Sequence, residues 1–163
     1  MQSYLESQKD YEIKNGDVFF QEKKVAEIFR KWDMYKTFLK KKDIDWKKYV
    51  SRRFLPDYCL YVLQTNTLFI IEYKTQKTEG SVDEKLQTCD FKLYYYKKLL
   101  KKTGLDVKFV FLLNSGWFND PKRKLKYKDV YKYIRKRHCR YFFDEIPMDF
   151  LGLPTVNETE ETK

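Results

Sequence analysis

Two apolar runs separated by a short polar stretch constrain this chain of 163 residues more than any other feature. The runs are residues 58–63 and 68–71, and residues 64–67 between them are polar and turn-forming. This spacing predicts a β-hairpin. Asp57 then begins the first strand and Glu72 ends the second, so the hairpin brings two carboxylates side by side at one end.

The residues around these acids have a consistent chemistry. Pro56 at the hairpin entry is tolerated because the first residue of a strand need not donate to the ladder. Lys74 lies two residues beyond Glu72 and therefore points to the same face of the strand. Two adjacent carboxylates bind a hard divalent cation, so the pattern suits phosphodiester cleavage.

The acid-x-Lys triplet alone carries little information in this chain. It occurs eight other times, beginning at Glu12, Glu22, Asp45, Asp83, Asp90, Asp106, Asp120 and Glu161. Only the triplet from Glu72 to Lys74 ends a run of four apolar residues and faces a Pro-Asp at hairpin distance. The interpretation therefore depends on Asp57 as much as on the triplet.

The net charge of the chain indicates what kind of molecule it could bind. Lys and Arg number 34 against 24 Asp and Glu, a net charge of +10. This balance favours a polyanion such as nucleic acid. A lysine-rich solvated surface would give the same count, and charge alone does not separate the two.

The few cysteine and histidine residues of this chain disfavour several kinds of functional site. Cys59, Cys89 and Cys139 lack CxxC spacing, and His138 is the single histidine, so a zinc site and Ser-His or Cys-His catalysis are disfavoured. The cysteines are typical of buried apolar residues in a reducing compartment. No apolar stretch approaches the roughly 20 residues of a membrane span, so we expect a cytoplasmic protein without a membrane partner.

The order of predicted elements indicates an α/β fold with a mixed central β-sheet flanked by helices. We expect helices at residues 22–39, 81–100 and 126–137, the second capped by Ser81 with Glu84. Strands are expected in the hairpin and at residues 105–113 and 140–143, with a loop at 114–121. The chain is expected to be a single domain, residues 1–163, with its core at about 22–154 and with 1–17 and 155–163 peripheral or disordered.

Residues 56–113 resemble the PD-(D/E)XK nuclease superfamily in motif and element order. Residues 80–88 and 141–154 further resemble segments of type II restriction endonucleases. The resemblance implies a restriction-endonuclease-like core and Mg²⁺-dependent hydrolysis of DNA, with Mn²⁺ able to substitute. Asp57 and Glu72 would hold the metal with the backbone carbonyl of Tyr73, and Lys74 would orient the water or stabilise charge on the phosphate.

Other residues are candidates for supporting roles. Glu27 could be a supporting acid on the first helix, although a solvated position explains it as well. Gln76 could contact substrate, and loop residues could read bases. The substrate-binding candidates are Gln76, Lys77, Asn114 and Asn119 on loops, and Lys122, Arg123 and Lys124 in a basic cluster that continues through Lys126, Lys128 and residues 135–137.

The sequence thus predicts a Mg²⁺-dependent endonuclease acting on double-stranded DNA, most similar to a type II site-specific enzyme of a restriction-modification system. One alternative is a structure-specific repair or recombination nuclease, and another is a non-catalytic DNA-binding module. One site per domain implies a homodimer, a partner subunit or two sequential nicks. The recognition sequence and a companion methyltransferase lie beyond what the residues indicate.

Overall fold

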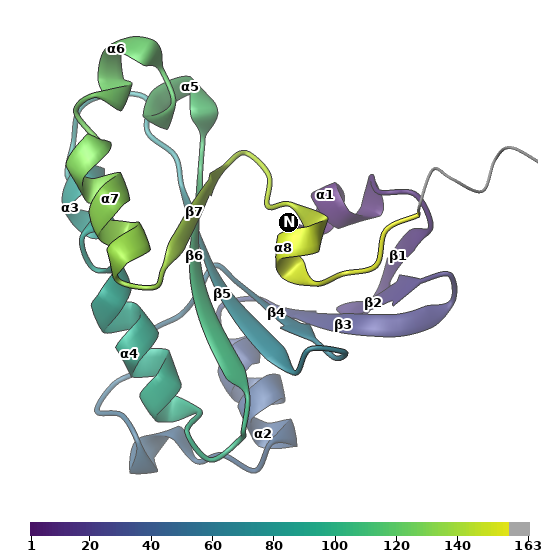
Figure 1. The fold of residues 1–163 in the computed structure, drawn as a ribbon. Helices are drawn as coiled ribbons and strands as arrows, with labels where there is room; N and C mark the ends of the chain where they lie inside the picture. The colour runs from purple at the N-terminus through teal and green to yellow at the C-terminus, as the bar shows by residue number, and fades with distance from the viewer. Residues whose placement is uncertain (157–163) are drawn as a thin grey trace, which may run out of the picture.

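Seven strands form one mixed β-sheet whose spatial order follows the sequence order, β1 to β7 (Figure 1). The computed structural model describes residues 1–156. Strands β1 to β5 pair antiparallel, and β5, β6 and β7 pair parallel. The strands are β1 Tyr11–Lys14, β2 Asp17–Phe20, β3 Lys23–Phe29, β4 Tyr58–Val62, β5 Thr67–Lys74, β6 Asp106–Leu113 and β7 Arg140–Phe143.

Helices cover both faces of this sheet, as the expected α/β class requires. In Figure 1, α4 and α7 lie on one side of the strands, and α1 and α8 lie on the other. The helices are α1 Gln2–Glu6, π-helix η1 Met34–Phe38, α2 Leu39–Lys41, 3₁₀-helix η2 Trp46–Lys48, α3 Val82–Leu86, α4 Cys89–Leu99, α5 Ser115–Phe118, α6 Pro121–Lys124, α7 Lys128–Lys136 and α8 Met148–Leu151. Within residues 1–156, no helix has the length and apolarity needed to cross a membrane.

Strand β5 is the centre of the molecule. Its first six residues, Thr67 to Glu72, are all buried. Leu68 and Ile70 join the core beneath α4, whereas Phe69 and Ile71 join the core beneath α1 and α8. A strand buried on both faces reads as a continuous apolar run, which is why the hairpin prediction for β4 and β5 and the strand prediction for β6 are confirmed.

The N-terminal third differs from expectation. Residues 22–39 do not form one helix but strand β3 followed by η1, and the segment before residue 17 is ordered and adds α1 and β1 to the fold. Asn15 and Gly16 both have positive φ angles in the β1–β2 turn, the conformation that an Asn-Gly pair supplies in a tight hairpin. Gln21 and Glu22 do the same between β2 and β3. Leu5 and Val18 are fully buried as a result.

The helix predicted from Ser81 is divided in two. It breaks between α3 and α4, where the Thr88 hydroxyl donates to the Lys85 carbonyl at 2.8 Å and so competes with helical hydrogen bonding. Ser81 makes no side-chain cap, contrary to the capping-box prediction. The expected loop at 114–121 contains α5 and the start of α6.

Two of the remaining predictions are confirmed. The basic helix at 126–137 corresponds to α7, and the strand at 140–143 corresponds to β7. The apolar segment at 146–154 contains α8, and Tyr11 donates to the Pro154 carbonyl at 2.6 Å, which ties β1 to it. Of the predicted polar tail, residues 157–163 lie outside the described residues.

Tyrosine hydroxyls fix the irregular segment that leads into β4. Tyr95 donates to the Arg52 carbonyl at 2.7 Å, and Tyr35 and Tyr96 donate to the Phe54 carbonyl at 2.8 and 3.1 Å. The Phe54 N–H donates back to Tyr35 at 3.1 Å. Backbone groups without strand partners are thereby satisfied, and the path of the chain toward Asp57 is set by side chains of α4 and η1.

This arrangement predicts different effects for two adjacent tyrosines. Tyr95→Phe removes a hydroxyl on which the backbone of this segment depends, so we expect the free energy of unfolding to fall by about 1–3 kcal/mol. Tyr94 is 60% exposed, and Tyr94→Phe should change it by less than about 0.5 kcal/mol. Urea unfolding followed by circular dichroism measures both, and equal losses in the two variants would contradict the assignment.

Candidate active site

Asp57 and Glu72 lie side by side at one end of the β4–β5 pair. Tyr58 pairs with Ile71 in the antiparallel register, so the next position outward places Asp57 opposite Glu72. Cys59 and Ile70 both face the core beneath α4. Because side chains alternate along a strand, Glu72 faces that same side of the sheet, and Asp57, two residues before Cys59, continues this alternation just outside β4.

A hydrogen bond links Asp57 to the backbone beside Glu72. The Asp57 Oδ2 atom accepts from the Tyr73 N–H at 2.9 Å. Strand β4 begins at Tyr58, so Tyr73 has passed the last strand partner on this side and Asp57 takes its place. The N–H and C=O of one strand residue point to the same side, and the Tyr73 carbonyl therefore also faces the Asp57 side of β5.

Two lysines hold the carboxylate of Glu72. Its Oε2 atom accepts a hydrogen bond from Lys74 Nζ at 2.7 Å and forms an ion pair with Lys92 Nζ at 3.0 Å. Glu72 is only 7% exposed, and the lysine side chains are 15% and 18% exposed. Charges this sheltered interact more strongly than surface ion pairs, so the cluster holds Glu72 and Lys74 in a defined geometry.

Lys92 is a member of this cluster that the sequence analysis missed. It lies on α4, three residues after the buried Cys89 and four before the buried Tyr96. A lysine at this spacing falls on the buried face of a helix. The sequence could have indicated a role for Lys92, because a cation on the buried face of a helix requires a buried partner.

The groups beneath Glu72 are kept protonated. Burial raises the pKa of the Cys59 thiol well above its usual value, and the charge of Glu72 adds to the effect. Burial likewise raises the pKa of Tyr96, with a smaller contribution from Glu72. Neither side chain is therefore suited to act as a nucleophile near neutral pH, and the reactive groups of this site are the carboxylates and the lysines.

Gln76 and Asn114 lie at the same edge of the sheet. Asn114 donates its N–H to the Lys74 carbonyl at 3.2 Å, and its side-chain oxygen accepts from the Gln76 N–H at 3.0 Å. The Gln76 amide donates to the Thr78 carbonyl at 2.8 Å, whereas its Oε1 atom is buried and accepts no hydrogen bond from residues 1–156. Asn114 thus has a structural role, and Gln76 has a free acceptor two residues beyond Lys74.

The other substrate-binding candidates are not part of this cluster. Lys77 is exposed in the segment after β5, and Asn119 is exposed between α5 and α6. Lys122, Arg123 and Lys124 are on α6. Arg123 stacks over Trp117 at 4.2 Å from the ring centre and pairs with Asp120 at 3.6 Å, so only the two flanking lysines are without such contacts in the described part of the chain.

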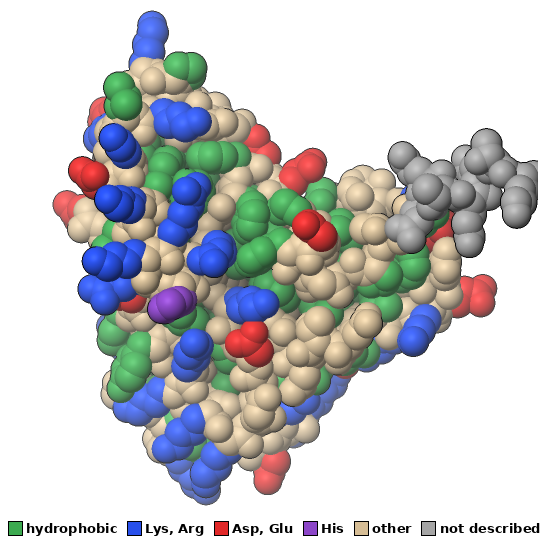
Figure 2. All heavy atoms as spheres, viewed as in Figure 1, with side chains coloured by type: hydrophobic (Ala, Val, Ile, Leu, Met, Phe, Trp, Pro, Cys, Tyr) green, Lys and Arg blue, Asp and Glu red, His purple; other side chains and the backbone are tan. Residues whose placement is uncertain are grey.

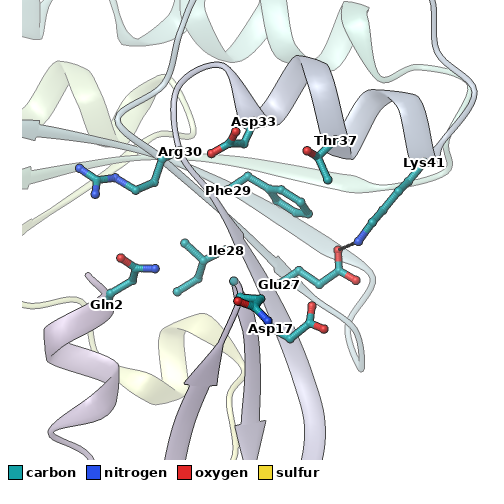
Figure 3. Close-up of a pocket in the computed structure, with 11 residues that line it drawn as sticks. Gln2, Asp17, Glu27, Ile28, Phe29, Arg30, Asp33, Thr37 and Lys41 are labelled. Atoms are coloured by element: carbon teal, nitrogen blue, oxygen red, sulfur yellow. Dashed lines mark hydrogen bonds and ion pairs between the residues drawn. The ribbon is translucent and has the colours of Figure 1, made fainter.

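Glu27 occupies a separate pocket, shown in Figure 3. It lies on strand β3 rather than on a helix, and it pairs with Tyr61, four residues along β4 from Asp57. Lys24 contacts its carboxylate at 2.6 Å and Lys41 at 3.2 Å. The structure thus does not bring Glu27 together with Asp57 and Glu72.

The donor set at Asp57 and Glu72 is of the type that Mg²⁺ takes. Two carboxylates on one face and the Tyr73 carbonyl on the Asp57 side offer only oxygen, and Mg²⁺ is usually held by one or two carboxylates with water and substrate phosphate. Among residues 1–156, no group of three or more His, Cys, Asp or Glu is placed to hold a metal ion. A two-carboxylate site does not need a third, so the residues fit the metal.

Three comparisons with known proteins were made for the whole chain. No protein-family model, curated protein or solved structure matched it.

The two lysines bound to Glu27 should make the free energy of unfolding depend on pH. Burial alone would raise the pKa of this carboxyl, but the hydrogen bonds and charges of Lys24 and Lys41 outweigh it and lower the pKa. The stabilisation is then fully present above the unfolded pKa of about 4.3 and is lost as the pH falls through the lower folded value. We expect Glu27→Gln to lose about 1 kcal/mol at pH 7 and less at pH 2.5, because the folded carboxyl loses its charge as the pH falls.

Urea unfolding at the two pH values tests this expectation. Glu12 is the matched control, because its ion pair with Lys14 is exposed and its replacement by Gln should change stability by less than about 0.5 kcal/mol at either pH. A Glu27→Gln loss that is the same at both pH values would show that the charge of Glu27 is not responsible.

Proposed function

We propose that this chain is a metal-dependent endonuclease that hydrolyses DNA phosphodiester bonds and has a restriction-endonuclease-like core. The observation that supports the proposal is the hydrogen bond from the Tyr73 N–H to Asp57, directly beside Glu72, together with the ion pair between Glu72 and Lys74. Two carboxylates and a lysine at one end of a hairpin can hold a divalent cation and stabilise charge on a phosphate, and this supports the proposal.

The position of the cluster in the sheet supports a binding role. Lys74 ends β5, where the sheet changes from antiparallel to parallel pairing. Ligands of open α/β sheets bind in the crevice outside the carboxyl ends of the strands, and Lys74 lies at such an end. In Figure 1 the chain leaves β5 and β6 at the same edge, toward α3 and α5.

Each residue has a role that its contacts support. Asp57, Glu72 and the Tyr73 carbonyl would hold Mg²⁺, which supplies a Lewis acid and a bound water of lowered pKa. Lys74 would orient the attacking water and stabilise negative charge on the scissile phosphate. Lys92 binds the same oxygen of Glu72 as Lys74 does and would position that carboxylate, and the free acceptor of Gln76 would take a hydrogen bond from water or substrate.

Cleavage of a supercoiled plasmid in Mg²⁺ tests the proposal. Asp57→Asn, Glu72→Gln and Lys74→Ala should each lower the cleavage rate by about 100-fold or more, the loss expected when one transition-state contact is removed. Discrete fragments would indicate a site-specific enzyme of the type II kind, whereas random nicking or junction cleavage would indicate a structure-specific nuclease.

The chain supplies a matched control for these variants. Asp106 and Lys108 form the same acid-x-Lys triplet at the opposite end of the neighbouring strand β6, and Asp106→Asn or Lys108→Ala should leave cleavage unchanged. Glu72→Gln leaves two sheltered lysines without a counter-charge, which can cost about 3–5 kcal/mol, so circular dichroism must first show that it is folded. Wild-type protein that cuts no DNA in Mg²⁺ or Mn²⁺ would refute the proposal.

A further inference from the structure

A groove on the face of α6, α7 and β7 is lined by cations. Its lining residues are Lys124, Leu125, Lys128, Tyr131, Lys132, Arg135 and Tyr141, and its volume is about 490 Å³. Figure 2 shows Lys and Arg side chains gathered over α6 and α7. We call this feature the basic groove.

The cations of the basic groove differ from the lysines that neutralise acids within the fold. Lys24, Lys41, Lys74, Lys92 and Lys126 each bind carboxylates. In residues 1–156, no ion pair with an acid is formed by Lys124, Lys128, Lys132 or Arg135. Asp129, the acid on the same helix, is not among the residues that line the groove. Uncompensated like charges repel one another, and a polyanion relieves that repulsion.

Aromatic side chains give the basic groove a rigid floor. Tyr131 and Tyr141 stack with ring centres 4.4 Å apart, and Tyr131 donates to the Phe118 carbonyl at 2.6 Å. Arg135 lies over the Tyr141 ring and donates to its hydroxyl. Leu125 is 78% exposed at the mouth, an apolar contact among the cations. A fixed floor with charged walls lowers the entropy that binding would otherwise lose.

The length of the cationic row suits a nucleic-acid strand. Lys128, Lys132 and Arg135 follow one face of α7 at spacings of four and three. At a rise of 1.5 Å per residue they extend over about 10 Å, which corresponds to roughly three nucleotide steps of one DNA strand. The segment that carries them begins beyond the carboxyl end of β6, whose last residue pairs with Lys74.

We propose that the basic groove binds the sugar-phosphate backbone of the DNA substrate and thereby positions the duplex for the site at Asp57 and Glu72. This inference rests on the proposed function for its choice of substrate, but binding is independent of cleavage. Phosphate contacts position a protein without reading sequence, so affinity from this groove is expected to be the same for unrelated sequences and steeply dependent on salt.

Binding of a fluorescent 20-base-pair duplex in EDTA tests the inference without cleavage. The combined variant Lys124→Ala, Lys128→Ala, Lys132→Ala and Arg135→Ala should bind at least 30-fold more weakly at 0.1 M salt. The slope of log affinity against log salt should become less steep by about 3.6, the value for four phosphate contacts. A second variant, with Lys124, Lys128 and Lys132 changed to Gln, retains Arg135 on Tyr141. Its slope should change by about three quarters as much as that of the combined variant.

The control variant removes the same charge from the opposite end of the molecule. Lys97, Lys98, Lys101 and Lys102 at and after the end of α4 are exposed and form no ion pairs within residues 1–156. Their replacement by Ala should weaken binding less than three-fold. Equal losses in the two sets, or no loss in the groove variant, would overturn the inference, as would equally tight groove-dependent binding of polyglutamate or of vesicles containing anionic lipid.

The two proposals can fail separately. Groove-dependent DNA binding by a wild-type protein that never cleaves would support the basic groove and refute the nuclease. Cleavage that depends on Asp57 and Glu72 but is unchanged in affinity and rate by the groove variants would support the nuclease and refute the groove.

Discussion

The carboxylate of Glu72 is the group on which much of the structure depends. It is the last buried residue of β5, a strand whose first six residues are all buried, and an unpaired charge there would cost several kcal/mol. Lys74 from the same strand and Lys92 from α4 supply the counter-charges, and this ties the helix to the sheet. Tyr95 and Tyr96 of the same helix then hold the backbone that leads to Asp57. A series of contacts therefore connects Glu72, through Lys92, Tyr95 and Tyr96 of α4, to the backbone segment that precedes Asp57.

The formal charges of Asp57, Glu72, Lys74 and Lys92 sum to zero. Asp57 and Glu72 carry two negative charges, and Lys74 and Lys92 carry two positive charges. Without a metal the cluster is neutral, which explains how it can remain sheltered in the folded chain. A divalent cation added to it would leave two positive charges next to an incoming phosphodiester, so metal and substrate would each favour the binding of the other.

The sequence predicted the centre of the fold well and its edges poorly. Strands β4, β5 and β6 are continuous apolar runs, a pattern that their burial requires. Residues 22–39 were misread because Val25, Ile28 and Phe29 fit helical spacing as well as a strand, and the Asn15-Gly16 turn that marks the first hairpin was overlooked. The pairing of Asp57 with Glu72 followed from hairpin register, whereas the approach of Lys92 depends on where α4 packs, which no local pattern specifies.

The net charge of +10 indicates a type of partner only after the lysines that pair with acids are separated from those that do not. Some neutralise acids within the fold: Lys24 and Lys41 at Glu27, Lys126 at Glu79 and Asp83, and Lys74 and Lys92 at Glu72. The net charge counts these acid-bound lysines together with the unpaired cations of α6 and α7. The field of each acid-bound lysine is, however, cancelled by its acid within a few ångströms. A lysine-rich surface of no specific purpose would scatter its free charges. Here, four of them converge on one groove with an aromatic floor, and this convergence, rather than the total, favours a polyanion as the partner.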